Sequence, residues 1–347
     1  MKKKSCSLLV VAFSCLFPFS AQAEVAVWED CKSLTSELAE LVDKQYYTQA
    51  FAAILGCLEN TNNASNLRKH LSMIGGPNDV QVGIYATQQA DNGTWDLAVG
   101  GDDTEIHTLL YSSLWNNPTL SHKGFSRAAG IVANTLLSDM KANPDEGAYV
   151  FREKKWVQVN SPLGYAVEEG LYNNANLLLK QNADPDYSWD QKAEVIWTWE
   201  EGWPVSKGFS FKDSSGWFAL KSVVLSQKSK EKYPVRDRLN MIYLLSKNNV
   251  DLDQTDNCGL TAMTNAVMCA TNHRNRTHCP KNFTPADYKE IVAYLVQIGA
   301  KKNVIGEQNS MCSYQGGLVS TKDVVKNIQD ENERKGWQRV LDGKYKY

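Results

Sequence analysis

Hydrophobic residues in the first part of the chain recur at helical intervals. Between residues 28 and 58 they fall every three to four positions in two runs, which predicts two helices packed as an antiparallel hairpin. Helical spacing returns between residues 104 and 140. The apolar positions that define these stretches are Leu34, Leu38, Leu41, Val42, Tyr47, Ala50, Phe51, Ile54 and Leu58, then Ile106, Leu109, Leu110, Leu114, Ile131, Val132 and Leu136.

A period of two interrupts the helical pattern between residues 80 and 99. Val82 and Ile84 alternate with polar neighbours, and the alternation returns from Trp95 onward. Asn92-Gly93 lies between the two runs, and Asn-Gly is a strong signal for a two-residue turn. The sequence therefore predicts a β-hairpin inside an otherwise helical region.

A turn-rich joint at residues 142–147, with Asn143-Pro144 at its centre, divides the chain. Beyond it the sequence repeats itself, which places a second domain there. We expect an N-terminal helical domain with a β-hairpin over residues 24–147, and a repeat domain over residues 148–347.

Two copies of one pattern stand out in the second half of the chain, and a degenerate third copy lies between them. They resemble the ankyrin repeat, with its T-P-L-x-x-A turn, its apolar helices and its closing G-A-D. The first copy runs Ser161-Pro162-Leu163-Gly164-Tyr165-Ala166, Gly170, Leu177-Leu178-Leu179 and Asn182-Ala183-Asp184; the last runs from Gly259 to Ala266, then Ile291, Val292, Leu295, Val296 and Gly299-Ala300; the third has Gly216 to Leu220 and Asn249-Val250-Asp251.

The copies depart from the ankyrin pattern in two ways. Gly164 and Thr264 stand where the family usually has a histidine, and the copies lie further apart than the usual ~33 residues. Insertions are therefore expected near residues 188–212 and 269–285, with a terminal cap over 308–325. The resemblance implies a mainly α fold with a degenerate ankyrin-repeat array, in which each copy buries its apolar face against its neighbours.

The N-terminus has the three parts of a secretory signal peptide. Lys2-Lys3-Lys4 precedes an apolar stretch from Ser7 to Phe19, and Ala21-Gln22-Ala23 fits a cleavage site. We expect cleavage after Ala23 and a periplasmic location, with an uncleaved anchor or a lipid anchor on Cys15 as the alternatives. The apolar stretch is shorter than the ~20 residues that span a bilayer, and we expect no membrane-spanning segment elsewhere.

The net charge of the chain bears on the kind of partner that it can bind. Cleavage removes three lysines and no acid, leaving 34 basic against 39 acidic residues and a net charge of −5. Such a chain has no bulk attraction for nucleic acid, so we expect none as a partner.

Six cysteines remain after cleavage, an even number that favours disulfides in an exported protein. Antiparallel helices would bring Cys31 and Cys57 together, with two free thiols as the alternative. We further predict a Cys269–Cys279 bridge that closes an insertion, and a Cys258–Cys312 bridge between neighbouring repeats.

Two segments partly resemble metal-binding or catalytic motifs. Cys269, His273, His278 and Cys279 form a ligand set that zinc would accept, but exported thiols oxidise and Arg274 and Arg276 oppose a cation. The segment Gly124-Phe125-Ser126 begins like a nucleophile elbow and then lacks its second glycine. We therefore predict that the protein is not an enzyme and that it binds no metal ion and no cofactor.

The insertion after the first repeat is rich in large aromatic residues. Tryptophan and tyrosine dominate binding hot spots because each buries a large area at little rotamer cost. We therefore name this insertion as the candidate partner-binding site; the open alternatives are that the rings fill core space or stack on sugars. The candidate residues are Tyr187, Trp189, Trp197, Trp199, Glu200, Glu201 and Trp203, with Trp217 nearby.

The ankyrin resemblance implies protein binding through an extended surface. Exported bacterial ankyrin-like proteins include immunity proteins that block a type VI secretion lipase in the periplasm, and accessory proteins that support peroxide defence. An acidic, disulfide-braced chain resembles the first group more. We expect a monomeric immunity protein that binds a nearby-encoded lipase or phospholipase toxin in a 1:1 complex, with an envelope accessory or scaffold protein as the alternative.

Overall fold

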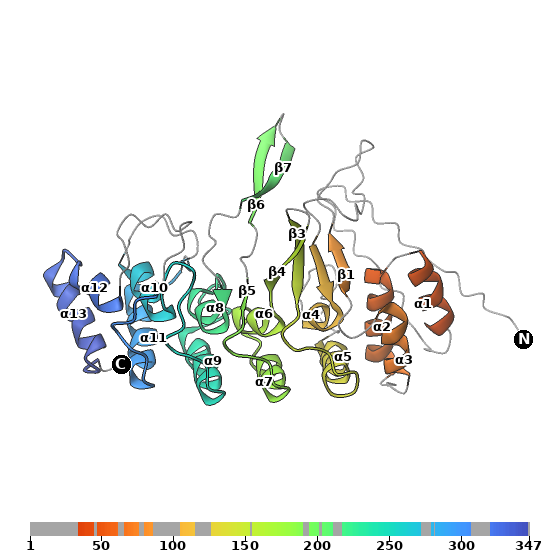
Figure 1. Ribbon diagram of the computed structural model, residues 1–347, viewed down its shortest axis with the longest axis horizontal. Helices are drawn as coiled ribbons and strands as arrows, with labels where there is room; N and C mark the ends of the chain where they lie inside the picture. The colour runs from red at the N-terminus through yellow and green to blue at the C-terminus, as the bar shows by residue number, and fades with distance from the viewer. Residues whose placement is uncertain are drawn as a thin grey trace, which may run out of the picture. The chain divides into compact units, whose positions relative to one another are not determined.

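The computed structural model is mainly helical, with short strands (Figure 1). Among the residues that it describes there are thirteen helices and eight strands. The described residues are 34–44, 47–61, 66–75, 80–85, 105–114, 126–152, 155–189, 194–200, 203–210, 217–271, 279–280, 282–306 and 320–345. No helix within these ranges is long and apolar enough to cross a membrane.

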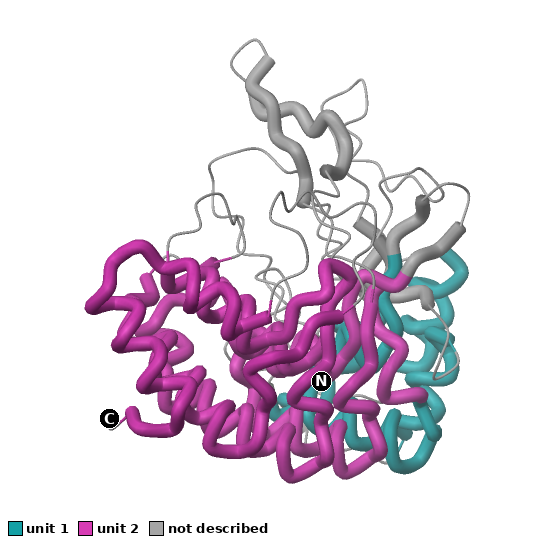
Figure 2. The backbone as a smooth tube through the Cα atoms, turned by 60° about the vertical axis from the view of Figure 1, so that its left-hand side comes forward, with its two compact units in different colours: residues 1–142, 149–156 teal, residues 143–148, 157–347 magenta. Residues whose placement is uncertain are grey.

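The chain divides into two compact units (Figure 2). The first comprises residues 1–142 and 149–156, and the second comprises residues 143–148 and 157–347. The first division falls inside the turn-rich joint at residues 142–147, and a short segment beyond it returns to the first unit.

The helices of the first unit begin with a hairpin. α1 (Leu34–Asp43) and α2 (Tyr47–Thr61) pack together as the apolar spacing predicted, and α3 (Leu67–Ile74) and α5 (Ser126–Ser138) pack on α2. His70 is buried within this group, and its Nε2 lies 3.0 Å from the Thr35 hydroxyl in a hydrogen bond that joins α3 to α1.

Four strands form one sheet in the order β1-β2-β3-β4. β1 (Val80–Tyr85) pairs antiparallel with β2 (Glu105–Thr108), so the prediction of helix from residue 104 onward was wrong for residues 105–108. Pairing with β1 keeps these residues extended. The predicted turn at residues 92–93 and the second arm from residue 95 lie outside the described residues.

The other two strands of this sheet, β3 (Ala148–Arg152) and β4 (Lys155–Asn160), were not predicted from the sequence. They lie where the chain passes between the two units, and β4 leads directly into the first helix of the second unit.

The described helices of the second unit form four pairs. The first helices of the pairs contact one another in the row α6-α8-α10-α12, and the second helices contact in the row α9-α11-α13. This stacked arrangement is the ankyrin-like array that the sequence predicted. Most of the predicted cap at residues 308–325 lies outside the described residues, and the last pair extends beyond it. The pairs are α6 (Pro162–Glu168) with α7 (Tyr172–Lys180), α8 (Ala219–Leu225) with α9 (Val235–Lys247), α10 (Ala262–Ala270) with α11 (Pro285–Gln297), and α12 (Thr321–Lys326) with α13 (Glu331–Leu341).

Side-chain caps start three of these first helices. The hydroxyl of Ser161 accepts from the Gly164 N–H at 2.9 Å, and that of Thr261 accepts from the Thr264 N–H at 3.1 Å. Ser320 caps α12 in the same way within a capping box. Each cap satisfies an N–H that the helix leaves without an internal partner.

Left-handed residues end the second helices. Asn182, Asn249 and Gly299 have φ of 65°, 62° and 109°, and these are residue types that tolerate that conformation. After each of them the next backbone N–H returns to the helix: Ala183 donates to Leu178 O at 3.0 Å, and Ala300 donates to Leu295 O at 3.0 Å. These are Schellman motifs. Their recurrence explains why the turns share a three-residue sequence pattern similar to Gly-Ala-Asp.

The same signals occur once more, in the first unit. Thr108 accepts from the Tyr111 N–H at 3.1 Å and starts α4 (Leu109–Leu114). Lys141 has a φ of 60°, and the Ala142 N–H donates to Leu136 O at 2.9 Å to close α5. Helices α4 and α5, which pack together, therefore form a repeat-like helix pair that the sequence pattern did not reveal.

Arg238 anchors the second pair. Its guanidinium is fully buried and donates to Val223 O at 2.7 Å, in the last turn of α8, and to Ser226 O at 3.0 Å, at its C-cap. It also lies 4.6 Å from the Tyr233 ring centroid and 4.3 Å from that of Phe283. Carbonyls at a helix C-terminus carry partial negative charge, so they offset part of the cost of burying the cation.

Candidate functional site

The predicted partner-binding residues do not share one environment. Tyr187 is half-buried and its hydroxyl donates to Gln158 Oε1 at 2.7 Å. Burial, followed by the charges of Asp145 and Glu146, raises the pKa of the Tyr187 phenol. Tyr187 is therefore held against strand β4.

Trp189 is a core residue, 5% exposed. It lies in β5 (Ser188–Trp189), which pairs with β8 (Trp217–Phe218) and places Trp189 opposite Trp217. For this side chain the structure supports the core-filling alternative, because a buried ring cannot contact a partner.

The space that Trp189 fills is created by Gly164 on α6. A Cβ at residue 164 would clash with the Trp189 ring and would lie 2.6 Å from Asn160 Oδ1. The glycine that replaces the usual ankyrin histidine is thus required by a tryptophan from the insertion.

Three of the candidate tryptophans occupy an antiparallel hairpin of their own (green in Figure 1). β6 (Glu194–Glu200) pairs with β7 (Trp203–Ser210), and the register sets Trp197 opposite Ser206, Trp199 opposite Pro204 and Glu200 opposite Trp203. Among the described strands, β6 and β7 pair only with each other. Glu201 lies outside the described residues.

The first helices of three repeats, α6, α8 and α10, are buried over most of their length. Every residue from Pro162 to Val167, from Ala219 to Leu225 and from Ala262 to Met268 is buried. In an array that binds partners along its inner helices, one face of each such helix would be exposed. These stretches of α6, α8 and α10 present no such face.

A buried ion pair links two neighbouring repeats. Lys221 Nζ of α8 lies 2.9 Å from Asp256 Oδ2, and the two side chains are 3% and 1% exposed. Asp256 also accepts from the N–H groups of Cys258 and Leu260 and from Asn265 Nδ2. The carboxylate is thus satisfied on several sides and orders the turn that precedes α10.

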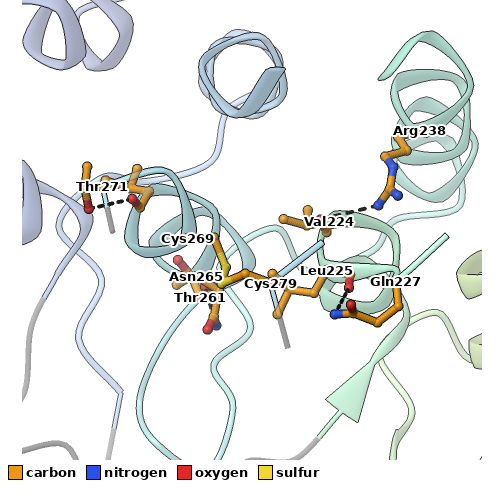
Figure 3. The surroundings of a disulfide bond; sticks show 10 residues. Val224, Leu225, Gln227, Arg238, Thr261, Asn265, Cys269, Thr271 and Cys279 are labelled. Atoms are coloured by element: carbon orange, nitrogen blue, oxygen red, sulfur yellow. Dashed lines mark hydrogen bonds between the residues drawn. A yellow bond between two sulfur atoms is a disulfide. The ribbon is translucent and has the colours of Figure 1, made fainter. Parts of the chain in front are cut away.

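The predicted Cys269–Cys279 disulfide is present, with the two Cα atoms 5.5 Å apart (Figure 3). Cys57 and Cys258 are also disulfide-bonded. Their predicted partners, Cys31 and Cys312, lie outside the described residues, so both of these pairings stay predictions.

Zinc does not fit the cysteine–histidine cluster. The thiols of Cys269 and Cys279 are joined to each other and cannot act as thiolate ligands. His273 and His278 lie outside the described residues, and no group of three metal-ligating side chains occurs within the described ranges.

Ser126 begins α5, where a carboxylate already occupies the helix end. Glu59 Oε1 accepts from the Ala128 N–H at 2.6 Å, and Arg127 Nη2 donates to Leu58 O at 3.1 Å. A helix N-terminus filled in this way has no free N–H donor at residue 128 for an oxyanion, so the geometry gives no support to a serine hydrolase.

The turns between the repeats carry a feature that the sequence pattern did not reveal. Aspartates at equivalent positions of successive turns are hydrogen-bonded into one continuous chain, which we call the aspartate spine. It comprises Asp145, Asp184, Asp186, Asp251 and Asp253. In each of these turns an aspartate follows an Asn or Asp by two positions, and this spacing was the sequence signal that could have indicated the spine.

Comparison with known proteins gives limited information. The chain matches no family model and no curated protein. Among solved structures, an ankyrin repeat domain (ABAYE2397) from Acinetobacter baumannii AYE is similar at 15% identity and a TM-score of 0.37, covering 88% of this chain and 100% of that chain. An ankyrin repeat protein, EF0377, is similar at 16% identity and a TM-score of 0.36, covering 84% and 96%. At these values the fold assignment rests on the contacts and caps described above.

Proposed function

We propose that this protein is a protein-binding module whose partner contacts the β6–β7 hairpin. The observation that carries the proposal is the hairpin itself: tryptophan positions 197, 199 and 203 lie in a two-stranded sheet that pairs with no other described strand. Isolated two-stranded sheets are marginally stable, and tryptophans are the commonest anchors of binding energy. The burial of α6, α8 and α10 favours the same conclusion, because these helices have little exposed surface for a partner.

The proposed partner is a lipase or phospholipase toxin delivered by type VI secretion, and the proposed location is the periplasm. The signal-peptide pattern at Lys2 to Ala23 and the disulfide-bonded cysteines support an oxidising compartment. Inhibition of an enzyme by a rigid binder requires a few strong anchors on a braced framework, which the Cys269–Cys279 bridge and the stacked repeats supply.

An inhibition assay tests this function. The purified mature protein, residues 24–347, is added to the purified product of the neighbouring gene, and the rate at which that product hydrolyses an ester is measured. We expect stoichiometric loss of hydrolysis with wild-type protein and a weaker loss with the Trp197→Ala variant. Unchanged hydrolysis with no detectable binding would reject the immunity role.

A further inference from the structure

The register of the β6–β7 hairpin shows which backbone groups face away from its ladder. Opposed pairs in an antiparallel ladder alternate between pairs that exchange hydrogen bonds and pairs whose N–H and C=O groups point outward. Two residues separate Glu200 from its partner Trp203, and the pair beside such a short turn is of the bonded kind. The alternation from that pair makes the N–H and C=O groups of Trp197 and Trp199 point to the outer edge of β6.

The outer edge of β7 is closed by a proline. Pro204 lies opposite Trp199, at an outward-facing position, and it has no N–H to offer to another strand. Its position also agrees with the alternation, because a proline cannot donate a ladder bond to β6. A further strand can therefore pair more completely with β6 than with β7.

The edge of β6 is uncharged between two acidic ends. Residues 195–199 read Val-Ile-Trp-Thr-Trp, which are all residue types enriched in strands, and Glu194 and Glu200 flank them. Natural sheets often protect an exposed edge with lysine or proline. β6 contains neither, so its edge is left open to another strand.

A second copy of this chain is a poor occupant of that edge. When two β6 strands pair antiparallel over their full length, residue 194 of each lies opposite residue 200 of the other, so glutamate faces glutamate at both ends. Like charges directly opposite each other destabilise a ladder, whereas opposite charges stabilise it. The edge therefore suits a different strand, with a basic residue opposite each glutamate.

We infer that the partner docks by strand addition: an extended segment of the partner protein, with a basic residue near each end, pairs antiparallel with the outer edge of β6. Backbone bonds to Trp197 and Trp199 supply affinity, and alternate side chains of the added strand supply selectivity. The third strand also stabilises a hairpin that is marginal alone. This inference rests on the proposed function, since it specifies how the hairpin meets its partner.

Proline substitution isolates the backbone contribution. Trp197→Ala and Trp197→Pro both remove the indole, and the proline variant also removes the outward N–H. We expect the proline variant to bind the neighbouring gene's product about tenfold more weakly than the alanine variant, because a carbonyl of the partner then loses its donor. Ser206→Pro makes the same change on the outer edge of β7, and it should bind as Ser206→Ala does.

A peptide probe tests the edge without the toxin. The peptide Lys-Thr-Val-Thr-Val-Thr-Lys has the length of β6 and a lysine at each end, and a matched peptide carries glutamate at both ends. At millimolar concentration the lysine peptide should slow amide hydrogen exchange at Trp197 and Trp199 by about twofold or more, and the glutamate peptide should not. The Thr198 N–H, which faces β7, is the internal reference.

The two measurements separate strand addition from the proposed function. Equal affinity of Trp197→Ala and Trp197→Pro for the neighbouring gene's product would overturn the inference, as would unchanged exchange at both amides with the lysine peptide. Failure of the wild-type protein to bind that product, with protection by the lysine peptide retained, would reject the toxin as the partner and support strand addition.

Discussion

The indole of Trp189 occupies the space that Gly164 leaves open on α6. One residue comes from the aromatic insertion and the other from the first turn of a repeat, so the insertion is built into the core of the array at its base. The contact separates the insertion into a structural part, at β5, and a candidate binding part, at β6 and β7.

We expect Gly164→Ala to lower the free energy of unfolding by about 1–3 kcal/mol, because the added methyl overpacks against the indole. Urea denaturation measures the change. Gly130→Ala is the matched control, since a Cβ at this helical site meets nothing within 4 Å, and it should stabilise by about 0.5–1 kcal/mol. Equal behaviour of the two variants would contradict the packing described.

Mutating Asp256 should reduce the stability of the fold more than mutating its partner Lys221. Asp256→Ala strands a buried ammonium and removes the acceptor for three other donors, so we expect a loss of about 3–5 kcal/mol. Lys221→Met should cost less, because Asp256 keeps its other hydrogen bonds. Denaturant unfolding of both variants ranks them, and the reverse order would show that the turn does not depend on Asp256.

His70 should make the first unit sensitive to acid. Burial, with a smaller contribution from Lys69, lowers the pKa of His70, so the neutral ring is favoured in the folded state. A base with a lowered folded pKa contributes stability above its unfolded value near 6.5, and this is lost as the pH falls below it. We expect His70→Gln to flatten the pH dependence of stability between pH 7 and pH 5, measured by denaturation at each pH. An unchanged profile would mean that His70 is protonated equally in both states.

Reduction of the Cys269–Cys279 bridge should weaken the second unit. The bridge spans ten residues, and the Cys269→Ser/Cys279→Ser double variant should lose about 3 kcal/mol of stability. Peptide mapping by mass spectrometry without reductant checks the bridge itself and also tests the predicted Cys31–Cys57 and Cys258–Cys312 pairings.

Added zinc should leave the Tm of the oxidised protein unchanged.

Local patterns predicted the local structure well. The spacing of Leu34 and Leu38 predicted α1, because an amphipathic face is encoded within a few residues. The four-stranded sheet was missed at β3 and β4, since short strands depend on partners elsewhere in the chain.

The tertiary features of the site were beyond such patterns. Trp189 could be assigned to the core only once its contact with Gly164 was known. The spine depends on bonds between residues 39 and 65 positions apart, such as Asp145 with Asp184 and Asp186 with Asp251. Sequence alone could name the tryptophans as a group, but burial was needed to divide them.

Binding through the β6–β7 hairpin is tested most directly by measuring affinity and Tm together. Trp197→Ala, Trp199→Ala and Trp203→Ala are titrated separately into the neighbouring gene's product by calorimetry, with Trp189→Ala as the core control. We predict that the three hairpin variants weaken binding about tenfold or more while keeping the wild-type Tm, and that Trp189→Ala lowers the Tm. Wild-type affinity in all three hairpin variants, or a loss of Tm as large as that of Trp189→Ala, would contradict the account.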